Sequence, residues 1–442
     1  MGPLILLLAF IPVASAPYLF EAVGFIQYLT PVRLVGIVSA LWAVGRDVAR
    51  GRFPPILRPT FSKVYLVYIV MMVLSGLFCV YVRGLGGAVR EKWQQLLSFM
   101  FFYYVVLSCV REVRHVRWVA ATSALTMGFF SIGSLIRYAT GAPVSDELIR
   151  QAGLSVDPNY YAVALLLVIP MAMYLVHTTP NPVLKMMWGL CSLVLMGALF
   201  TTVSRGGIVV GLPVLLLAML ALSRNKGKAM LGLGVLVVIG ALVLVSTAPG
   251  QHFIQSFLER MARSEVVEDV RGVGEAELST TTRYHLYIAG LKMTLYNWYI
   301  GVGPGNFYWY SIDYGAIAYN MAHNMYLATG GELGLIGLGA FLGMIYLTFR
   351  DLLWIRRRAL EVGDVPSFCM SNAFFSGLLA FCACSLFLHS EAEKFFWMVM
   401  FVTVAFRIRF QEERAGVLGV EEPVRMKPAE PVVVRPTVGP NV

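Results

Sequence analysis

One histidine stands where an imidazole could do acid–base chemistry. Only six histidines occur in the 442-residue chain, and His323 lies where a long polar segment, 248–324, meets an apolar run. A neutral imidazole at such a junction can accept a proton from a hydroxyl group near physiological pH. Gly330 and Gly331 follow at helical spacing and keep this face thin, so that a substrate or another helix could approach it. The competing interpretation is a histidine that caps a helix above a glycine-mediated helix contact.

Two arginines have the chemistry to hold an anion. Arg205 follows a tight turn and precedes Gly206 and Gly207 at the start of an expected helix, and Arg283 stands at the start of another. A helix start offers unpaired backbone N–H groups and a partial positive charge. The planar guanidinium stays charged and donates paired hydrogen bonds, which suits a diphosphate. The two arginines are therefore a candidate diphosphate clamp; the alternatives are a topological anchor for Arg205 and ordinary loop charges.

Other polar residues on the same side carry weaker signals. Four more arginines are candidates to join the site, namely Arg83, Arg90, Arg137 and Arg150. Asp157 and Pro158 come directly before an apolar run. We interpret Asp157 as a helix N-cap and Pro158 as a first-turn residue, which explains the pair more simply than a catalytic aspartate does.

The sequence contains nothing that resembles a set of metal ligands. The carboxylates of the large polar segment, such as Glu265, Glu268 and Asp269, occur in a stretch without fixed geometry. We therefore expect a metal-independent reaction with no cofactor.

The composition indicates the kind of protein that must position these residues. Hydrophobic residues make up 58% of the chain and charged residues only 14%, with a mean hydropathy of +0.71. A soluble globular chain carries about 25% charged residues. These values exclude a soluble enzyme, a disordered protein and a nucleic-acid-binding domain, and they predict an all-α polytopic membrane protein. The net charge of +10 then reflects loop cations that set the orientation in the membrane.

The apolar runs predict about twelve transmembrane helices. They are expected near 3–20, 32–45, 62–82, 94–110, 116–136, 159–176, 184–202, 206–222, 229–247, 325–349, 369–388 and 395–406. The chain then divides into residues 1–247 with nine spans, a large loop at 248–324, three spans within 325–410 and a disordered cytoplasmic tail at 411–442. With the N-terminus in the cytoplasm, 22 of the 35 Lys and Arg residues fall on the cytoplasmic side. The positive-inside rule therefore places both termini in the cytoplasm and the large loop outside.

The large loop has a pattern of its own. Its part from Arg260 to Glu277 is rich in charge and glycine, and we expect it to be mobile. Threonines at 280–282 then precede apolar residues at helical spacing, which predicts an amphipathic, interfacial helix up to about Trp298. The glycines of 301–307 follow and predict a set of tight turns.

The ordered set of these motifs resembles a known family. The motifs are Ser204-Arg205-Gly206-Gly207, then Arg283 at a helix start, then Gly301-Val302-Gly303-Pro304-Gly305-Asn306-Phe307, then His323-Asn324-Met325-Tyr326-Leu327 with the following glycine-rich turns. They resemble the O-antigen ligase-like family, which contains O-antigen ligases, O-antigen and exopolysaccharide polymerases, and protein O-oligosaccharyltransferases. The strong part of the resemblance covers about 200–340, and the twelve-span layout agrees over the whole chain. The motifs are specific for the superfamily and not for one of its members.

The resemblance implies a membrane glycosyltransferase of the GT-C-like sort. It implies a glycan donor linked to undecaprenyl diphosphate, used at the periplasmic face of the bacterial inner membrane. It implies that His323 is the family's essential loop histidine and that Arg205 and Arg283 are among its diphosphate-binding arginines. An O-antigen ligase of lipopolysaccharide biosynthesis, with lipid A-core as acceptor, is the expectation. A polymerase, to which Asp157-Pro158-Asn159 also points, and a protein O-oligosaccharyltransferase stay open.

A transporter or flippase for lipid-linked glycans is the alternative from another class. Twelve spans also suit a transporter, but transporters tend to have internal repeats and broken helices, and no repeat is evident here. Glu332, inside the tenth expected span, is an ionisable residue that a transporter could use. A transporter should depend on Glu332, whereas a transferase should depend on His323 and the two arginines.

Overall fold

The computed structural model describes most of the chain. It covers residues 1–11, 31–84, 86–140, 157–228, 230–232, 234, 242, 245–263 and 280–417. Its helices are α1 (Gly2–Phe10), α2 (Pro31–Ala49), α3 (Thr60–Arg83), α4 (Gly87–Cys109), α5 (Val113–Ala139), α6 (Pro158–Thr178), α7 (Pro182–Thr201), the π-helix η3 (Gly206–Gly211), α8 (Leu212–Leu222), α10 (Ala248–Arg263), α11 (Thr280–Tyr296), α12 (Phe307–Tyr310), the 3₁₀ turn η4 (Ile312–Tyr314), α13 (Met325–Glu361), α14 (Val365–Cys384) and α15 (Lys394–Val417).

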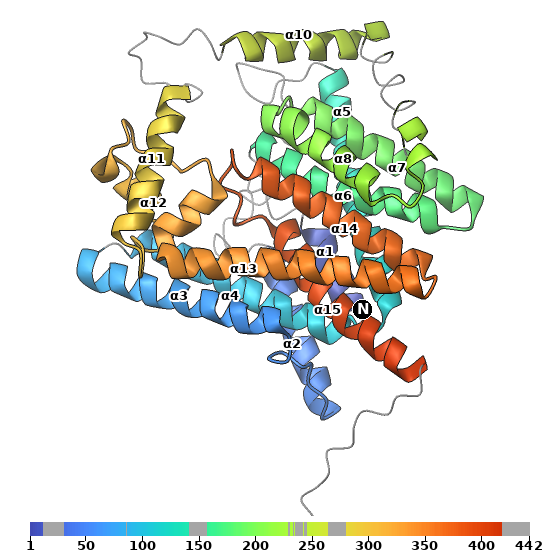
Figure 1. The fold of residues 1–442 in the computed structure, drawn as a ribbon, viewed down its shortest axis with the longest axis horizontal. Helices are drawn as coiled ribbons and strands as arrows, with labels where there is room; N and C mark the ends of the chain where they lie inside the picture. The colour runs from blue at the N-terminus through green and yellow to red at the C-terminus, as the bar shows by residue number, and fades with distance from the viewer. Residues whose placement is uncertain are drawn as a thin grey trace, which may run out of the picture.

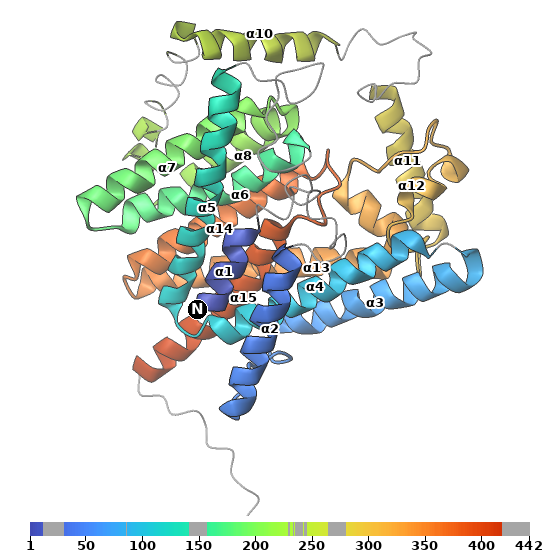
Figure 2. The ribbon, with the colours of Figure 1, turned by 180° about the vertical axis from the view of Figure 1, so that it is seen from behind.

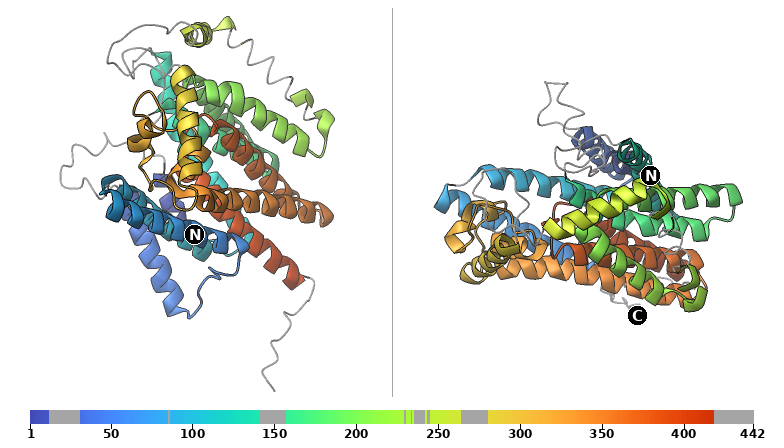
Figure 3. Two further views of the ribbon diagram at one scale, coloured as in Figure 1. Left: turned by 60° about the vertical axis from the view of Figure 1, so that its left-hand side comes forward. Right: turned by 90° about the horizontal axis from the view of Figure 1, so that it is seen from above.

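The long helices form a bundle with the loop helices at one end. Helix α13 packs against α3 and α14, and α14 packs against α6, which in turn contacts α5 and α7. In Figure 1 helices α3 and α13 run across the picture, while α11 and α12 gather at the end where α13 begins. Figure 2 shows α1 and α2 on the opposite face of the bundle. Figure 3 shows α11 standing across the end of α13. Helix α10 contacts the bundle where the ring of Phe253 meets Phe200 of α7.

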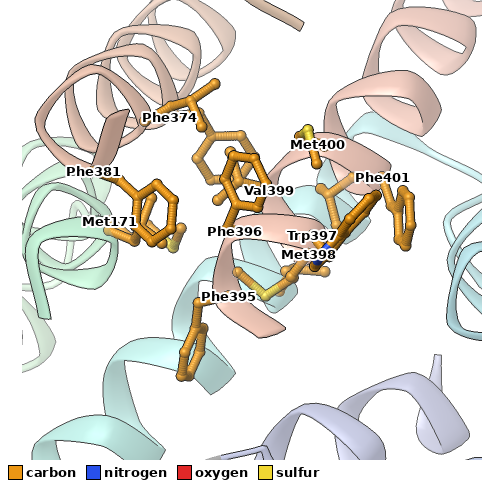
Figure 4. Close-up of a cluster of buried hydrophobic side chains, with 14 of the residues drawn as sticks. Met171, Phe374, Phe381, Phe395, Phe396, Trp397, Met398, Val399, Met400 and Phe401 are labelled. Carbon is orange, nitrogen blue, oxygen red and sulfur yellow. The ribbon is translucent and has the colours of Figure 1, made fainter. Parts of the chain in front are cut away.

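An aromatic core fixes the centre of the bundle. Figure 4 shows the start of α15, where Phe396 faces Phe381 of α14 and Met171 of α6, while Trp397 and Phe401 point to the other side. The rings of Phe381 and Phe396 stack with their centroids 4.7 Å apart, and Trp397 stacks on Phe99 at 4.8 Å. Side chains of this size bury large apolar areas, so they hold α15 firmly in the bundle. This matters for function because the segment directly before α15 belongs to the candidate site.

The fold is that of an all-α polytopic membrane protein. Every regular element among the described residues is helical, and six helices there are long and apolar enough to cross a membrane, namely α3, α5, α6, α7, α13 and α14. Helix α7 turns large apolar side chains such as Met186 and Leu190 outward, as a lipid-facing helix does. The count of twelve stays a prediction, because α2, α4 and α15 include charged residues and most of 229–247 lies outside the described residues.

Arginine side chains form hydrogen bonds between helices at the end of the bundle that the sequence predicts to be cytoplasmic. Each of them bonds to a neighbouring helix end: Arg46 to Ser108, Arg117 to Thr179, Arg356 to Leu222, Arg409 to Val110 and Arg414 to Asp364. The contacts bring loop cations of the predicted cytoplasmic set to one end of the bundle. Helices α6 and α13 both begin at the opposite end, and α14 ends there, so His323 and Asp157 lie away from these cations.

Helix α13 is broken inside its apolar part. Gly334 has a φ of +72° and interrupts the helix, and the turns that follow α11 dock against the break. Leu335 N–H donates to Trp298 O at 2.7 Å, and Gly303 N–H donates to Glu332 O at 3.0 Å. A broken helix is a feature that transporters use, but here the freed backbone groups bond to the chain's own loop. Gly301, Gly303 and Gly305 all have positive φ, which confirms the predicted tight turns.

Two other predictions about local structure have clear outcomes. Helix α11 covers Thr280–Tyr296, so the helix predicted there is confirmed, while its place at the membrane interface stays a prediction. Helix α15 runs on to Val417 and so includes the start of the segment predicted as a disordered tail. The rest of that tail and the segment 264–279 lie outside the described residues.

Candidate active site

Five segments that are far apart in sequence meet at the end of the bundle near α11. They are the start of α6, the turn between α7 and η3, the start of α11, residues 323–324, and the segment 385–393 between α14 and α15. Ser204 Oγ donates to Asn159 Oδ1 at 2.8 Å, which joins the second segment to the first. The Tyr287 hydroxyl donates to Leu386 O at 2.7 Å, and Asn324 donates to the same oxygen at 3.1 Å. The site is therefore built by tertiary contacts between segments of the bundle.

His323 has a strained backbone and a buried ring nitrogen. Its φ is +46°, a left-handed conformation that non-glycine residues rarely adopt and that often marks a functional position. The residue that caps α13 is Asn324, whose side chain accepts from Tyr326 N–H and Leu327 N–H, both at 2.9 Å. His323 is thus not the capping residue that one interpretation of the sequence proposed. Its Nε2 is buried and has no hydrogen-bond partner among the described residues.

The surroundings of His323 keep its imidazole neutral. Burial lowers the pKa of His323 to about 4; a proton on His389 and the cation of Arg283 lower it further, and Asp157 opposes this. These electrostatic effects also show that Arg283 and Asp157 lie near His323, because charges act strongly only at short range. A neutral imidazole has a free lone pair, which is the form that a general base needs.

The two candidate arginines occupy different parts of the site. Arg283 lies in the first turn of α11, and its Nε is buried without a partner among the residues that the structure describes. Arg205 precedes η3, a short π-helix of the kind often found at functional sites. Val203, two residues earlier, also has a positive φ, of 47°. Ser204, in this same turn, bonds to Asn159 of α6. The turn that carries Arg205 is therefore fixed to the start of α6.

The glycines beside these residues serve packing more than ligand access. A Cβ on Gly330 would lie 2.8 Å from Thr294 Oγ1, and one on Gly331 would lie 3.3 Å from Met293 Cβ. Helix α11 therefore packs directly against Gly330 and Gly331 of α13. Of the two possibilities that the sequence left open, a substrate or another helix at this face, the structure shows a helix. A Cβ on Gly207 would lie 2.8 Å from Ala162, whereas one on Gly206 would meet nothing within 4 Å.

His389 and Tyr160 are site residues that sequence reasoning missed. The rings of His323 and His389 meet edge to face, with their centroids 5.6 Å apart. The Tyr160 hydroxyl lies 2.6 Å from His389 Nε2 and donates to His389 O at 3.1 Å. The only sequence signal was that His389, one of six histidines, directly follows the expected span 369–388.

Glu332 takes part in a separate buried cluster. Its carboxylate accepts from Phe307 N–H at 3.4 Å. It lines a small cavity together with Lys92 and Glu391, and these two residues form an ion pair at 2.8 Å. Burial alone would raise the pKa of Glu391, but Lys92 and His389 lower it. Glu332 is therefore held by protein groups that also fix the loop turns after α11.

The remaining candidates from the sequence have mixed outcomes. Asp157 accepts from Asn159 N–H at 2.6 Å, and Pro158 begins α6, which confirms the predicted N-cap. Arg137 lies near Tyr161 of α6, while Arg83 ends α3 and Arg90 lies in the first turn of α4. Arg150 lies outside the described residues. The part of the chain that the structure describes contains no cluster of three side chains able to hold a metal ion.

Comparison with known protein families agrees with the motifs. Residues 190–342 match the family model described as O-antigen ligase. The matched segment begins in α7 and ends within α13, so it contains Arg205, Arg283 and His323. The match confirms the resemblance that the sequence motifs indicate. None of the curated proteins compared with the chain matches it.

Proposed function

We propose, on the premise that the chain is of the O-antigen ligase-like family, that the protein transfers a glycan from undecaprenyl diphosphate to an acceptor hydroxyl. The observation that carries the proposal is the neutral, buried imidazole of His323 close to the Arg283 guanidinium, inside the segment that matches the family. A base beside a guanidinium whose Nε has no partner among the described residues suits a reaction in which a hydroxyl loses a proton while a diphosphate leaves.

His323 acts as the general base. Its imidazole is neutral at physiological pH because burial and the Arg283 cation oppose a second proton on the ring. The acceptor oxygen attacks the anomeric carbon as its proton moves to His323. Attack opposite the leaving group inverts the anomeric configuration. The reaction uses no metal, because the glycosyl–diphosphate bond already has a good leaving group.

Arg283 and Arg205 hold the diphosphate. Negative charge grows on the leaving diphosphate during bond cleavage, and a preorganised guanidinium stabilises it. The buried Arg283 Nε without a partner fits this role, since such a group gains most from an anionic ligand. Arg205 acts from the turn before η3, where Gly206 leaves the backbone open.

The acceptor that we propose is lipid A-core, which makes the protein an O-antigen ligase of the inner membrane with its site at the periplasmic face. The alternative acceptors are a second lipid-linked glycan, for a polymerase, and a protein hydroxyl. A transporter is a weaker alternative, although α13 is broken at Gly334. The backbone groups freed at that break bond to the loop after α11, and Glu332 bonds to Phe307 N–H.

The experiment presents the purified protein, in lipid nanodiscs, with a lipid-diphosphate glycan and one acceptor at a time. Product with lipid A-core supports the ligase, and product only with a second lipid-linked glycan or a pilin-like protein replaces it by the polymerase or the protein transferase. A cysteine in place of Tyr296, which is 71% exposed on α11, tests the orientation. Labelling by an impermeant reagent in outer-membrane-permeabilised cells supports a periplasmic site, and protection contradicts it.

A further inference from the structure

His389 is a buried imidazole in the site for which the proposed reaction has no role yet. It lies in the segment between α14 and α15, and its ring meets the ring of His323 with centroids 5.6 Å apart and planes 80° apart. At this separation, one hydrogen bond or one bridging water can connect two imidazoles. The two rings come from segments that only the folded bundle brings together.

The segment that carries His389 is held rigidly. Ser385 and Ser390 share a hydroxyl hydrogen bond of 2.6 Å. The Trp397 indole donates to Glu391 O at 2.8 Å, and Lys92 pairs with the Glu391 carboxylate at 2.8 Å. Contacts on both sides of His389 therefore fix the direction of its ring, as a group that exchanges a proton with a neighbour requires.

Tyr160 fixes the tautomer of His389. Its hydroxyl has one proton, which it donates to His389 O at 3.1 Å. With the hydroxyl proton assigned in this way, the Tyr160 oxygen accepts from His389 Nε2–H at 2.6 Å, and the lone pair of His389 lies on Nδ1. Nδ1 of His389 and Nε2 of His323 are both buried without partners among the described residues. Two facing imidazoles thus each keep one ring nitrogen available.

The charges around the two rings favour a proton on His389 over His323. Burial opposes charge on both rings. Next to His323, a proton on His389 and the cation of Arg283 add to this, and Asp157 opposes it. Next to His389, the carboxylates of Glu391 and Asp157 attract a proton, and Lys92 repels it. Glu391 Oε2 is also buried without a partner among the described residues, so it can stabilise the charged form.

We propose that His389 receives the proton that His323 removes from the acceptor hydroxyl, an inference that rests on the proposed function. As the acceptor oxygen bonds to the anomeric carbon, its proton moves to His323. The bond between that carbon and the diphosphate oxygen breaks, and its electron pair stays on the diphosphate. His323 passes a proton to Nδ1 of His389, and after the product has left the proton returns through His323 to the water that refills the site. His323 is then neutral again for the next turnover.

The test substitutes His389 and measures more than rate. His389→Gln keeps an N–H for Tyr160 but cannot carry a proton. We expect kcat to fall about 10–100-fold, with the KM for the lipid-diphosphate glycan unchanged. The acid limb of the pH–rate profile should move to higher pH, because the charge of His389 no longer opposes protonation of His323. The matched control is His285→Gln on α11, whose ring contacts Tyr284, and it should behave as the wild type does.

Wild-type kcat and pH profile in His389→Gln would overturn the inference and leave the proposed function in place. A wild-type protein that makes no product with any acceptor would overturn the proposed function instead. If the glutamine variant does not reach wild-type membrane levels, Tyr160→Phe tests the same relay, because it removes the hydroxyl that fixes the tautomer. In Tyr160→Phe a reduced kcat with an unchanged KM for the lipid-diphosphate glycan supports the relay, and an unchanged kcat overturns it.

Discussion

Replacing His323 by asparagine separates the chemistry of the imidazole from the backbone that holds it. His323 has a φ of +46°, and a left-handed conformation costs most residues about 1–2 kcal/mol, with asparagine among the few that adopt it readily. The substitution also removes the buried Nε2 that has no partner among the described residues. We therefore expect His323→Asn to insert normally, with a Tm equal to or above that of the wild type.

The same variant should lose nearly all turnover. General-base catalysis contributes about 10²–10⁴-fold, which corresponds to roughly 2.7–5.4 kcal/mol of transition-state stabilisation. The assay measures single-turnover transfer from the lipid-diphosphate glycan, together with donor binding and thermal stability. Donor binding should survive, because arginines hold the diphosphate. A folded His323→Asn variant with more than about a tenth of the wild-type rate would refute the role of His323 as base, and His323→Gln checks the result in a longer side chain.

Three further predictions follow from the same geometry. Activity should fall as the pH drops through about 4, the pKa of His323. In Arg283→Gln this fall should occur at higher pH, because one charge that opposes protonation of His323 is gone. A fall at the wild-type pH would mean that Arg283 does not act on His323. Arg205→Ala and Arg283→Ala should each weaken donor binding and turnover by about 10–150-fold, the equivalent of one charge-assisted hydrogen bond. Lysine at either position should restore part of the activity. Full activity of both alanine variants would show that neither arginine binds the diphosphate. Gly334→Ala should lower the Tm and the membrane level, since its Cβ would lie 2.6 Å from Trp298 O at a φ of +72°, whereas a Cβ on Gly339 of the same helix meets nothing within 4 Å; equal stability of the two variants would contradict the packing argument.

Local features were predictable from the sequence because they depend on near neighbours in the chain. The Asp157 cap of α6, the course of α11 and the glycine turns of 301–305 each follow from a few adjacent residues. Positive φ values and N-caps have strong residue preferences, so the residue types alone carry the information.

The composition of the site was harder to predict because it depends on packing. His389 and Tyr160 are 229 positions apart, and they meet only because α6 packs against α14 and the aromatic core fixes the start of α15. For the same reason, the sequence could not decide whether Gly330 faces a substrate or a helix. The structure places Thr294 of α11 against it.

Counting the products of one turnover distinguishes glycan transfer from glycan transport. Purified protein, radiolabelled lipid-diphosphate glycan and lipid A-core are mixed, and released undecaprenyl diphosphate and glycosylated acceptor are quantified together. If His323 is the base of a glycan transfer, the wild type releases equal amounts of undecaprenyl diphosphate and glycosylated acceptor, and His323→Asn releases neither product. Movement of the glycan lipid across a proteoliposome membrane with its diphosphate bond intact, and dependence on Glu332 instead of His323, would contradict it.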